Sequence, residues 1–117
     1  MIVEFLPGGR RVRVAGEALW QDRDHALWRV PAGLVCDGAS IPRPLWWLIG
    51  SPLTGKYRTA AIFHDAYYKD HCGRTRKQVD RMFLEKMRED GVGWIVARAL
   101  YAGVRAGGWR AWTKEVL

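Results

Sequence analysis

The chain has few cysteines and no long apolar run, and these absences exclude several protein classes. Cys36 and Cys72 are the only thiols in 117 residues, too few for a disulfide framework, although one bridge between them stays an alternative. No Cys-x-x-Cys pair and no Cys/His zinc spacing occurs. The longest apolar stretch, residues 91–101, is interrupted by Arg98 and is too short to span a bilayer.

The composition is that of one small globular domain, residues 1–117. Hydrophobic residues make up 49% of the chain and charged residues 26%, which excludes an intrinsically disordered protein. The first residues do not form a basic segment followed by an apolar core, so we expect no signal peptide and a cytoplasmic location.

The net charge of +7 is typical of proteins that bind nucleic acid, anionic lipid or an acidic protein, and equally of a solvated basic surface. The basic residues form no dense run and no nucleic-acid module signature, so nucleic acid is the weakest of these partners. The seven Trp favour a surface that meets a lipid or protein partner, because indole combines an apolar ring with an N–H donor.

The order of sequence patterns predicts an α+β fold, with a small N-terminal antiparallel sheet packed against three or four helices. Residues 1–36 are strand-rich: residues 2–6 and 11–15 flank Pro7-Gly8-Gly9-Arg10 as one hairpin, and residues 18–20 and 26–30 form a second. Residues 37–53 read as an ordered loop with a short helix at 45–49. Residues 54–117 are helical, with helices predicted at 54–71, 75–89, 93–105 and 109–116.

Two caps define the helical half. Gly73 is suited to end the helix at 54–71, because glycine adopts the left-handed conformation of a C-cap. Thr75 and Gln78 have the spacing of a capping box, in which each side chain bonds the other residue's backbone N–H. A helix therefore starts at Thr75.

The helical pattern directs a histidine and a carboxylate of the next helix towards the protein interior. Tyr57, Ala61, His64 and Tyr68 recur at steps of four, three and four, so His64 lies on an inward stripe, with Asp65 about a quarter-turn away. Asp80 lies within the apolar arc of the next helix. A carboxylate that faces a core needs a partner, which can be the inward His64, an arginine or a tyrosine hydroxyl.

This arrangement has a catalytic and a structural interpretation. A histidine held by a buried carboxylate has a fixed tautomer and raised basicity, as a general base requires. The same pair can equally be a hydrogen-bonded part of the core. Solvent access distinguishes the two, because a catalytic His64 must meet a water-filled cleft, whereas a structural one is sealed.

The loop from Asp37 to Pro44 offers two further roles. Asp37 and Ser40 can bond loop amides, or Asp37 and loop carbonyls can join Asp65 around a calcium ion, which prefers oxygen ligands. Ser40 as a nucleophile beside His64 is a third interpretation, but no nucleophile-elbow sequence surrounds it.

Two motifs resemble a family of short phage and prophage proteins that is a domain of unknown function. They are residues 30–43, with Asp37-Gly38-Ala39-Ser40-Ile41-Pro42, and residues 60–68, with His64-Asp65-Ala66-Tyr67-Tyr68. The resemblance covers residues 28–112. It implies a phage or prophage protein, in the host cytoplasm or in the virion, but implies no activity.

The order of these motifs also resembles that of phospholipase A-two enzymes, especially the bacterial and fungal branch. That resemblance implies His64 as the base that activates water, Asp80 as the carboxylate that orients it, and Tyr68 as a support of the pair. It further implies calcium bound by Asp65 and by Asp37 with its loop. The disulfides of those enzymes are absent here, and the strand-rich N-terminal third does not belong to that fold.

Two functions follow as hypotheses. The first is a calcium-assisted ester or lipid hydrolase that works at a lipid surface. The second is a non-catalytic phage virion, tail or accessory protein that binds a phage or host protein.

Overall fold

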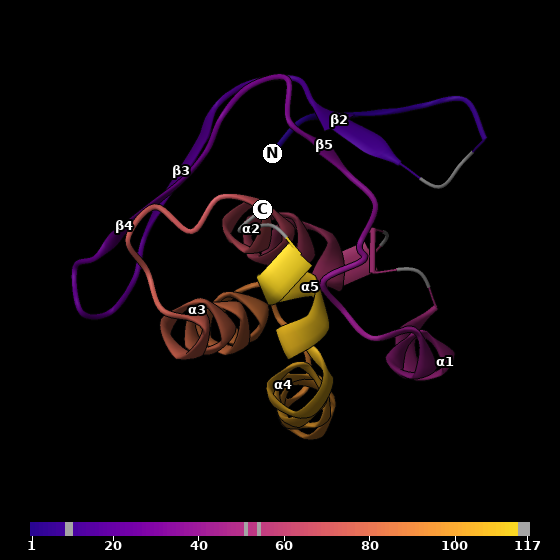
Figure 1. Cartoon of the computed structure of the whole chain (residues 1–117), viewed down its shortest axis with the longest axis vertical. Coiled ribbons are helices and arrows are strands. Elements are labelled where there is room, and N and C mark those ends of the chain that lie inside the picture. The colour runs from indigo at the N-terminus through magenta and orange to yellow at the C-terminus, as the bar shows by residue number, and fades with distance from the viewer. Residues whose placement is uncertain (9–10, 51, 54, 115–117) are drawn as a thin grey trace.

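A computed structural model describes residues 1–8, 11–50, 52–53 and 55–114, and it confirms the α+β fold (Figure 1). The strands are β1 (Val3–Phe5), β2 (Val12–Val14), β3 (Ala18–Gln21), β4 (Leu27–Val30) and β5 (Val35–Cys36). The helical elements are η1 (Arg43–Leu45), α1 (Trp46–Ile49), η2 (Gly55–Tyr57), α2 (Arg58–Lys69), α3 (Arg76–Glu89), α4 (Trp94–Gly107) and α5 (Trp109–Lys114). No helix in the described ranges is long and apolar enough to cross a membrane.

The strands form two small sheets rather than one. Both predicted hairpins are antiparallel pairs, β1 with β2 and β3 with β4, although residues 9 and 10 of the first turn lie outside the described residues. The sequence analysis did not predict β5, which adds to the first sheet in the order β1-β2-β5. Because Cys36 of β5 pairs with Val12, the sheet fixes the chain directly before the Asp37 loop.

Helix α2 is the centre of the molecule. Its residues 60–68 are buried without interruption, as expected for a helix with neighbours on every side. It contacts α3 and α5 as well as β4 and β5, and Figure 1 shows β2 and β5 above α2, the β3–β4 hairpin to its left, and α3 and α4 below it. Polar side chains of α2 therefore reach the loop, the sheet and the helices from one short segment.

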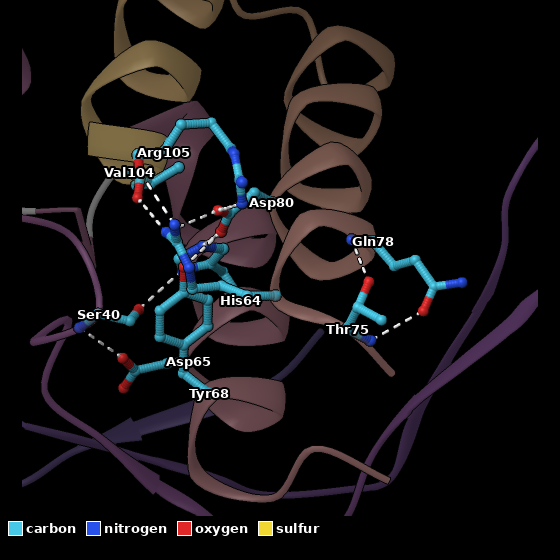
Figure 2. Close-up of polar contacts among 10 residues, drawn as sticks. Ser40, His64, Asp65, Tyr68, Thr75, Gln78, Asp80, Val104 and Arg105 are labelled. Atoms are coloured by element: carbon cyan, nitrogen blue, oxygen red, sulfur yellow. Dashed lines mark hydrogen bonds and ion pairs between the residues drawn. The ribbon is translucent and has the colours of Figure 1, made fainter. Parts of the chain in front are cut away.

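Of the two predicted caps, the capping box is confirmed and the Gly73 C-cap is wrong, because α2 ends before Gly73 and has Asp70 as its C-cap. Thr75 Oγ1 accepts the Gln78 N–H at 3.1 Å and Gln78 Oε1 accepts the Thr75 N–H at 2.8 Å, so the capping box is confirmed (Figure 2). The helix predicted at 54–71 is shorter than expected. Residues 55–57 form the 3-10 turn η2, and α2 ends at Lys69 because the backbone of the next residue, Asp70, is extended. Residue 54 and residues 115–117 of the predicted termini lie outside the described part of the chain.

Gly103 allows α4 to approach the segment that follows the loop. A Cβ atom at this position would lie 2.2 Å from Leu45 Cδ1. We therefore expect Gly103→Ala to lower the free energy of unfolding by about 1–3 kcal/mol in urea denaturation, because overpacking outweighs the higher helix propensity of alanine. Gly93→Ala, whose Cβ meets no atom within 4 Å, should change it by less than about 1 kcal/mol. Equal effects of the two substitutions would contradict this packing.

Candidate functional site

His64 lies at the centre of a buried hydrogen-bonded network (Figure 2). Its Nε2 is 2.7 Å from Asp80 Oδ1 on α3, and its Nδ1 is 2.9 Å from Ser40 Oγ in the loop. The Tyr68 hydroxyl, one turn further along α2, donates to the same Asp80 oxygen at 2.5 Å. The predicted inward direction of His64 and its predicted pairing with Asp80 are confirmed.

Asp80 accepts hydrogen bonds from every kind of partner that the sequence analysis allowed. Besides His64 and Tyr68, Arg105 donates to its Oδ2 at 2.8 Å and Arg76 at 3.4 Å. Burial by itself raises the pKa of the Asp80 carboxyl, but the hydrogen bonds from His64, Tyr68 and Arg105 and the charge at His64 outweigh it and lower the pKa below its ordinary value. Asp80 is therefore ionised at neutral pH.

The ionised Asp80 determines which atoms of the network carry protons. A carboxylate only accepts, so His64 Nε2 carries the hydrogen that bonds Asp80, and an unprotonated Nδ1 is the acceptor for the Ser40 hydroxyl. Burial, and then the hydrogen bond to Asp80, raise the pKa of the Tyr68 phenol, so Tyr68 also stays a donor. Proton donation thus runs from Ser40 through His64 to Asp80.

The structure brings Ser40 into the site more closely than its sequence context indicated. Ser40, His64 and Asp80 are the residue types of a nucleophile, base and orienting-acid triad. In serine proteases Nε2 faces the serine and Nδ1 the carboxylate, whereas here Nδ1 faces Ser40 and Nε2 faces Asp80. The sequence analysis did not single out Arg76 and Arg105. Arg76 could have been found from its i,i+4 spacing to Asp80, but Arg105 comes from α4 and has no local signal.

Asp65 binds the loop through backbone amides. Its Oδ2 accepts from the N–H groups of Asp37 at 3.3 Å and Gly38 at 3.4 Å, and its Oδ1 accepts from that of Ser40 at 3.1 Å. The Asp37 carboxylate bonds the N–H of Ala39 within the loop itself. The loop therefore presents donors to Asp65, whereas a cation requires acceptors.

The calcium site expected at Asp65 and Asp37 stays a prediction, and in the described structure both carboxylates accept hydrogen bonds from backbone amides. The two carboxylates serve different amides, and the part of the chain described here holds no group of three His, Cys, Asp or Glu side chains placed for a metal ion. Calcium prefers oxygen ligands, so binding it here would require these carboxylates to exchange amide donors for the ion.

The central residues of the network are closed off from solvent, whereas Arg76 and Arg105 are partly exposed. His64 and Asp80 have no exposed surface, and Ser40 and Asp65 are each 2% exposed. The cluster lies where the loop, α2 and α3 meet the C-terminal end of α4. There Arg76 donates hydrogen bonds to the backbone carbonyls of Val104 and Arg105. By the criterion of solvent access, the geometry favours the structural interpretation of His64.

The two cysteines are free thiols in contrasting environments. Cys36 is fully buried, and burial, followed by the negative charge of Asp65, raises the pKa of its thiol to about 12. We expect iodoacetamide at pH 8 to alkylate the exposed Cys72 while native Cys36 stays unmodified, since the thiolate is the reactive form. Mass spectrometry of the folded protein would measure this, with urea-unfolded protein as the control. Equal labelling of both thiols in the native protein would contradict the burial of Cys36.

Comparisons with known proteins identify relatives but no activity. A family described as "Protein of unknown function (DUF1353)" matches residues 12–104, as the resemblance to a domain of unknown function implied. The chain is 40% identical over 99 residues to uncharacterized protein y4jT of Sinorhizobium fredii, covering 83% of this chain and 29% of the relative. It is 37% identical over 87 residues to uncharacterized protein y4iH of the same strain, covering 74% of this chain and 36% of the relative. The chain thus spans about a third of the length of these relatives. No solved structure matches it significantly.

Proposed function

We propose that this chain, which belongs to the DUF1353 family of proteins of unknown function, is a non-catalytic accessory or structural protein. The burial of His64 carries this proposal: its ring has no exposed surface and both of its nitrogens are bonded within the protein. A general base needs a position from which to take a proton from substrate or water. At this site Ser40 fills that position.

The network has a structural task that explains its residue types. It joins the loop through Ser40, α2 through His64 and Tyr68, and α3 through Asp80. Arg105 adds a direct ion pair from α4. A polar network in which each member is hydrogen-bonded can specify one arrangement of its segments, because any other arrangement leaves a buried polar group without a partner.

The proposal includes a phage or prophage origin and a phage or host protein as partner. The support for this origin is the resemblance of residues 30–43 and 60–68 to short phage proteins. The exposed apolar side chains of Trp47, Leu48, Trp94 and Ile95 support a partner, since aromatic residues are enriched in protein interfaces. A lipid surface is the other candidate for these side chains, and cytoplasm or virion is the proposed location.

A hydrolase is the second candidate, favoured by the proton path from Ser40 through His64 to Asp80. If residues 37–41 moved away from α2, His64 Nδ1 could take a proton from the Ser40 hydroxyl or from a water that replaces it, as the phospholipase A-two resemblance implies. Asp80 and Tyr68 already hold the ring for this role. Calcium would require Asp65 to exchange its amide donors for the metal.

Activity assays separate the two candidates. Wild type, His64→Gln and Ser40→Ala would be incubated with p-nitrophenyl esters and with phospholipid vesicles, each with and without calcium. We expect the wild type to hydrolyse these substrates no faster than either variant. Hydrolysis that both substitutions abolish, in proteins that circular dichroism shows to be folded, would overturn the non-catalytic proposal.

A further inference from the structure

A polar groove lies between the β3–β4 hairpin and α3, on a surface that the His64 network does not use. Two hollows form it, of about 250 and 330 Å³, and both are lined by Asp22 and Glu85. Their volumes lie near the lower end of the range of small-ligand sites, about 300–1,000 Å³. The shared residues make the hollows neighbouring parts of one groove, with room for a small ligand.

Glu85 has an unused hydrogen-bond acceptor where the two hollows meet. Its Oε1 lies 3.9 Å from Arg81 Nε, which is too long for a hydrogen bond, and its Oε2 is buried without a partner among the described residues. The Asp22 carboxylate, in contrast, already accepts from the amides of Asp24 and Ala26 and from the indole of Trp28. Because Oε2 is closed off from solvent, the partly exposed Glu85 carboxylate offers its other oxygen, Oε1, to a ligand donor.

The groove has one aromatic ring that a ligand can reach. Trp28 is buried, with the Arg74 guanidinium 3.9 Å from its ring centroid and Tyr67 against its edge. Trp20 in the other hollow is only partly buried. Lys86 Nζ lies 5.4 Å from the Trp20 ring centroid. Trp20 and Glu85 line the same hollow, so a partly exposed aromatic ring lies beside the Glu85 carboxylate.

The charged residues around the groove balance one another. Asp24 and Glu89 supply acceptors, while Arg23, Arg81 and Arg88 supply donors. A nucleic-acid site would be lined by positive charge alone, and a site for an apolar ligand would be lined mainly by hydrophobic side chains. Closely spaced donors and acceptors beside an aromatic ring suit a neutral ligand with many hydroxyl groups.

We propose that this groove binds a saccharide of one or two rings. A sugar hydroxyl donates to Glu85 Oε1, neighbouring hydroxyls bond the arginines, and a sugar ring packs on Trp20. The proposal goes beyond the non-catalytic function and does not depend on it, because no residue of the groove belongs to the His64 network.

Nuclear magnetic resonance titration tests the proposal. ¹⁵N-labelled protein would be titrated to about 10 mM, tenfold above a millimolar Kd, with glucose, galactose, mannose, N-acetylglucosamine and disaccharides of each. We expect saturable shifts confined to residues 20–24 and 78–89 for at least one sugar. Glu85→Gln and Trp20→Ala should each weaken that binding about tenfold or more. Glu4→Gln, on β1 and paired with Arg13, should leave it unchanged.

Three results would overturn the proposal: no saturable shift with any of these sugars, shifts that map away from the groove, or unchanged affinity in Glu85→Gln. The spectrum of each variant reports whether it is folded, so loss of binding is distinguished from loss of structure. None of these results would bear on the role of His64.

Discussion

Asp80→Asn is expected to lower the free energy of unfolding by about 3–5 kcal/mol, the range for removing one partner of a buried ion pair. The carboxylate accepts from His64, Tyr68 and two arginines and has no exposed surface. The amide keeps its shape, but it loses the charge and places an N–H₂ group against donors. Urea denaturation followed by circular dichroism would measure the change.

Glu89→Gln is the matched control for this prediction, because it removes the same charge from the exposed side of α3. It should change the free energy of unfolding by less than about 0.5 kcal/mol.

The pH dependence of stability is a second readout for Asp80. The folded-state pKa of Asp80 is lowered from 3.8, so its stabilisation is present above that pH and is lost as the pH falls through the folded value. Asp80→Asn should flatten this acid limb, and an unchanged acid limb would contradict the role of Asp80.

Asp65→Ala is expected to produce the second largest effect, a loss of about 3 kcal/mol, because two buried N–H groups and one partly buried N–H group lose their acceptor. Hydrogen exchange of the amides of residues 37, 38 and 40 should accelerate along with the global loss. The stability change would be measured by urea denaturation and the exchange by nuclear magnetic resonance.

Asp70→Ala provides the control, since the exposed Asp70 side chain accepts one hydrogen bond from a backbone N–H, that of Cys72 at 3.3 Å. It should cost less than about 1 kcal/mol. If calcium instead raised the melting temperature of the wild type and Asp65→Ala abolished this rise, Asp65 would be a metal ligand and the loop would have to rearrange around the ion.

Local patterns were sufficient to predict the elements that follow a regular period. The strands of both hairpins alternate, and the Thr75–Gln78 capping box fixes the start of α3. Strand β5 was not predicted because it has only two residues, and its pairing with β2 depends on a segment more than 20 residues away. The same limit applies to Arg105, which reaches Asp80 from a different helix.

The site illustrates the difference between residue type and residue direction. Helical periodicity placed His64 and Asp80 inward, and the cost of a buried charge required a partner for Asp80 without deciding between His64, an arginine and a tyrosine. Periodicity does not determine whether an irregular loop turns its carbonyl oxygens or its N–H groups towards Asp65. The choice between a calcium ligand and an amide acceptor therefore depends on the path of residues 37–40, which is fixed by β5 on one side. On the other side, the glycine at position 38 has φ +77° and packs against Pro52 and Trp46.

Chemical modification of the histidines tests the central claim, that His64 is sealed in a structural network, most directly. His25 is exposed, whereas His64 has no exposed surface. Diethylpyrocarbonate reacts with the unprotonated imidazole and would be followed by mass spectrometry at pH 7 in the native protein. We predict that His25 is modified while His64 stays unmodified until the protein unfolds. Modification of His64 at a rate near that of His25 in folded protein would contradict a sealed network and would instead support an opening loop above a catalytic base.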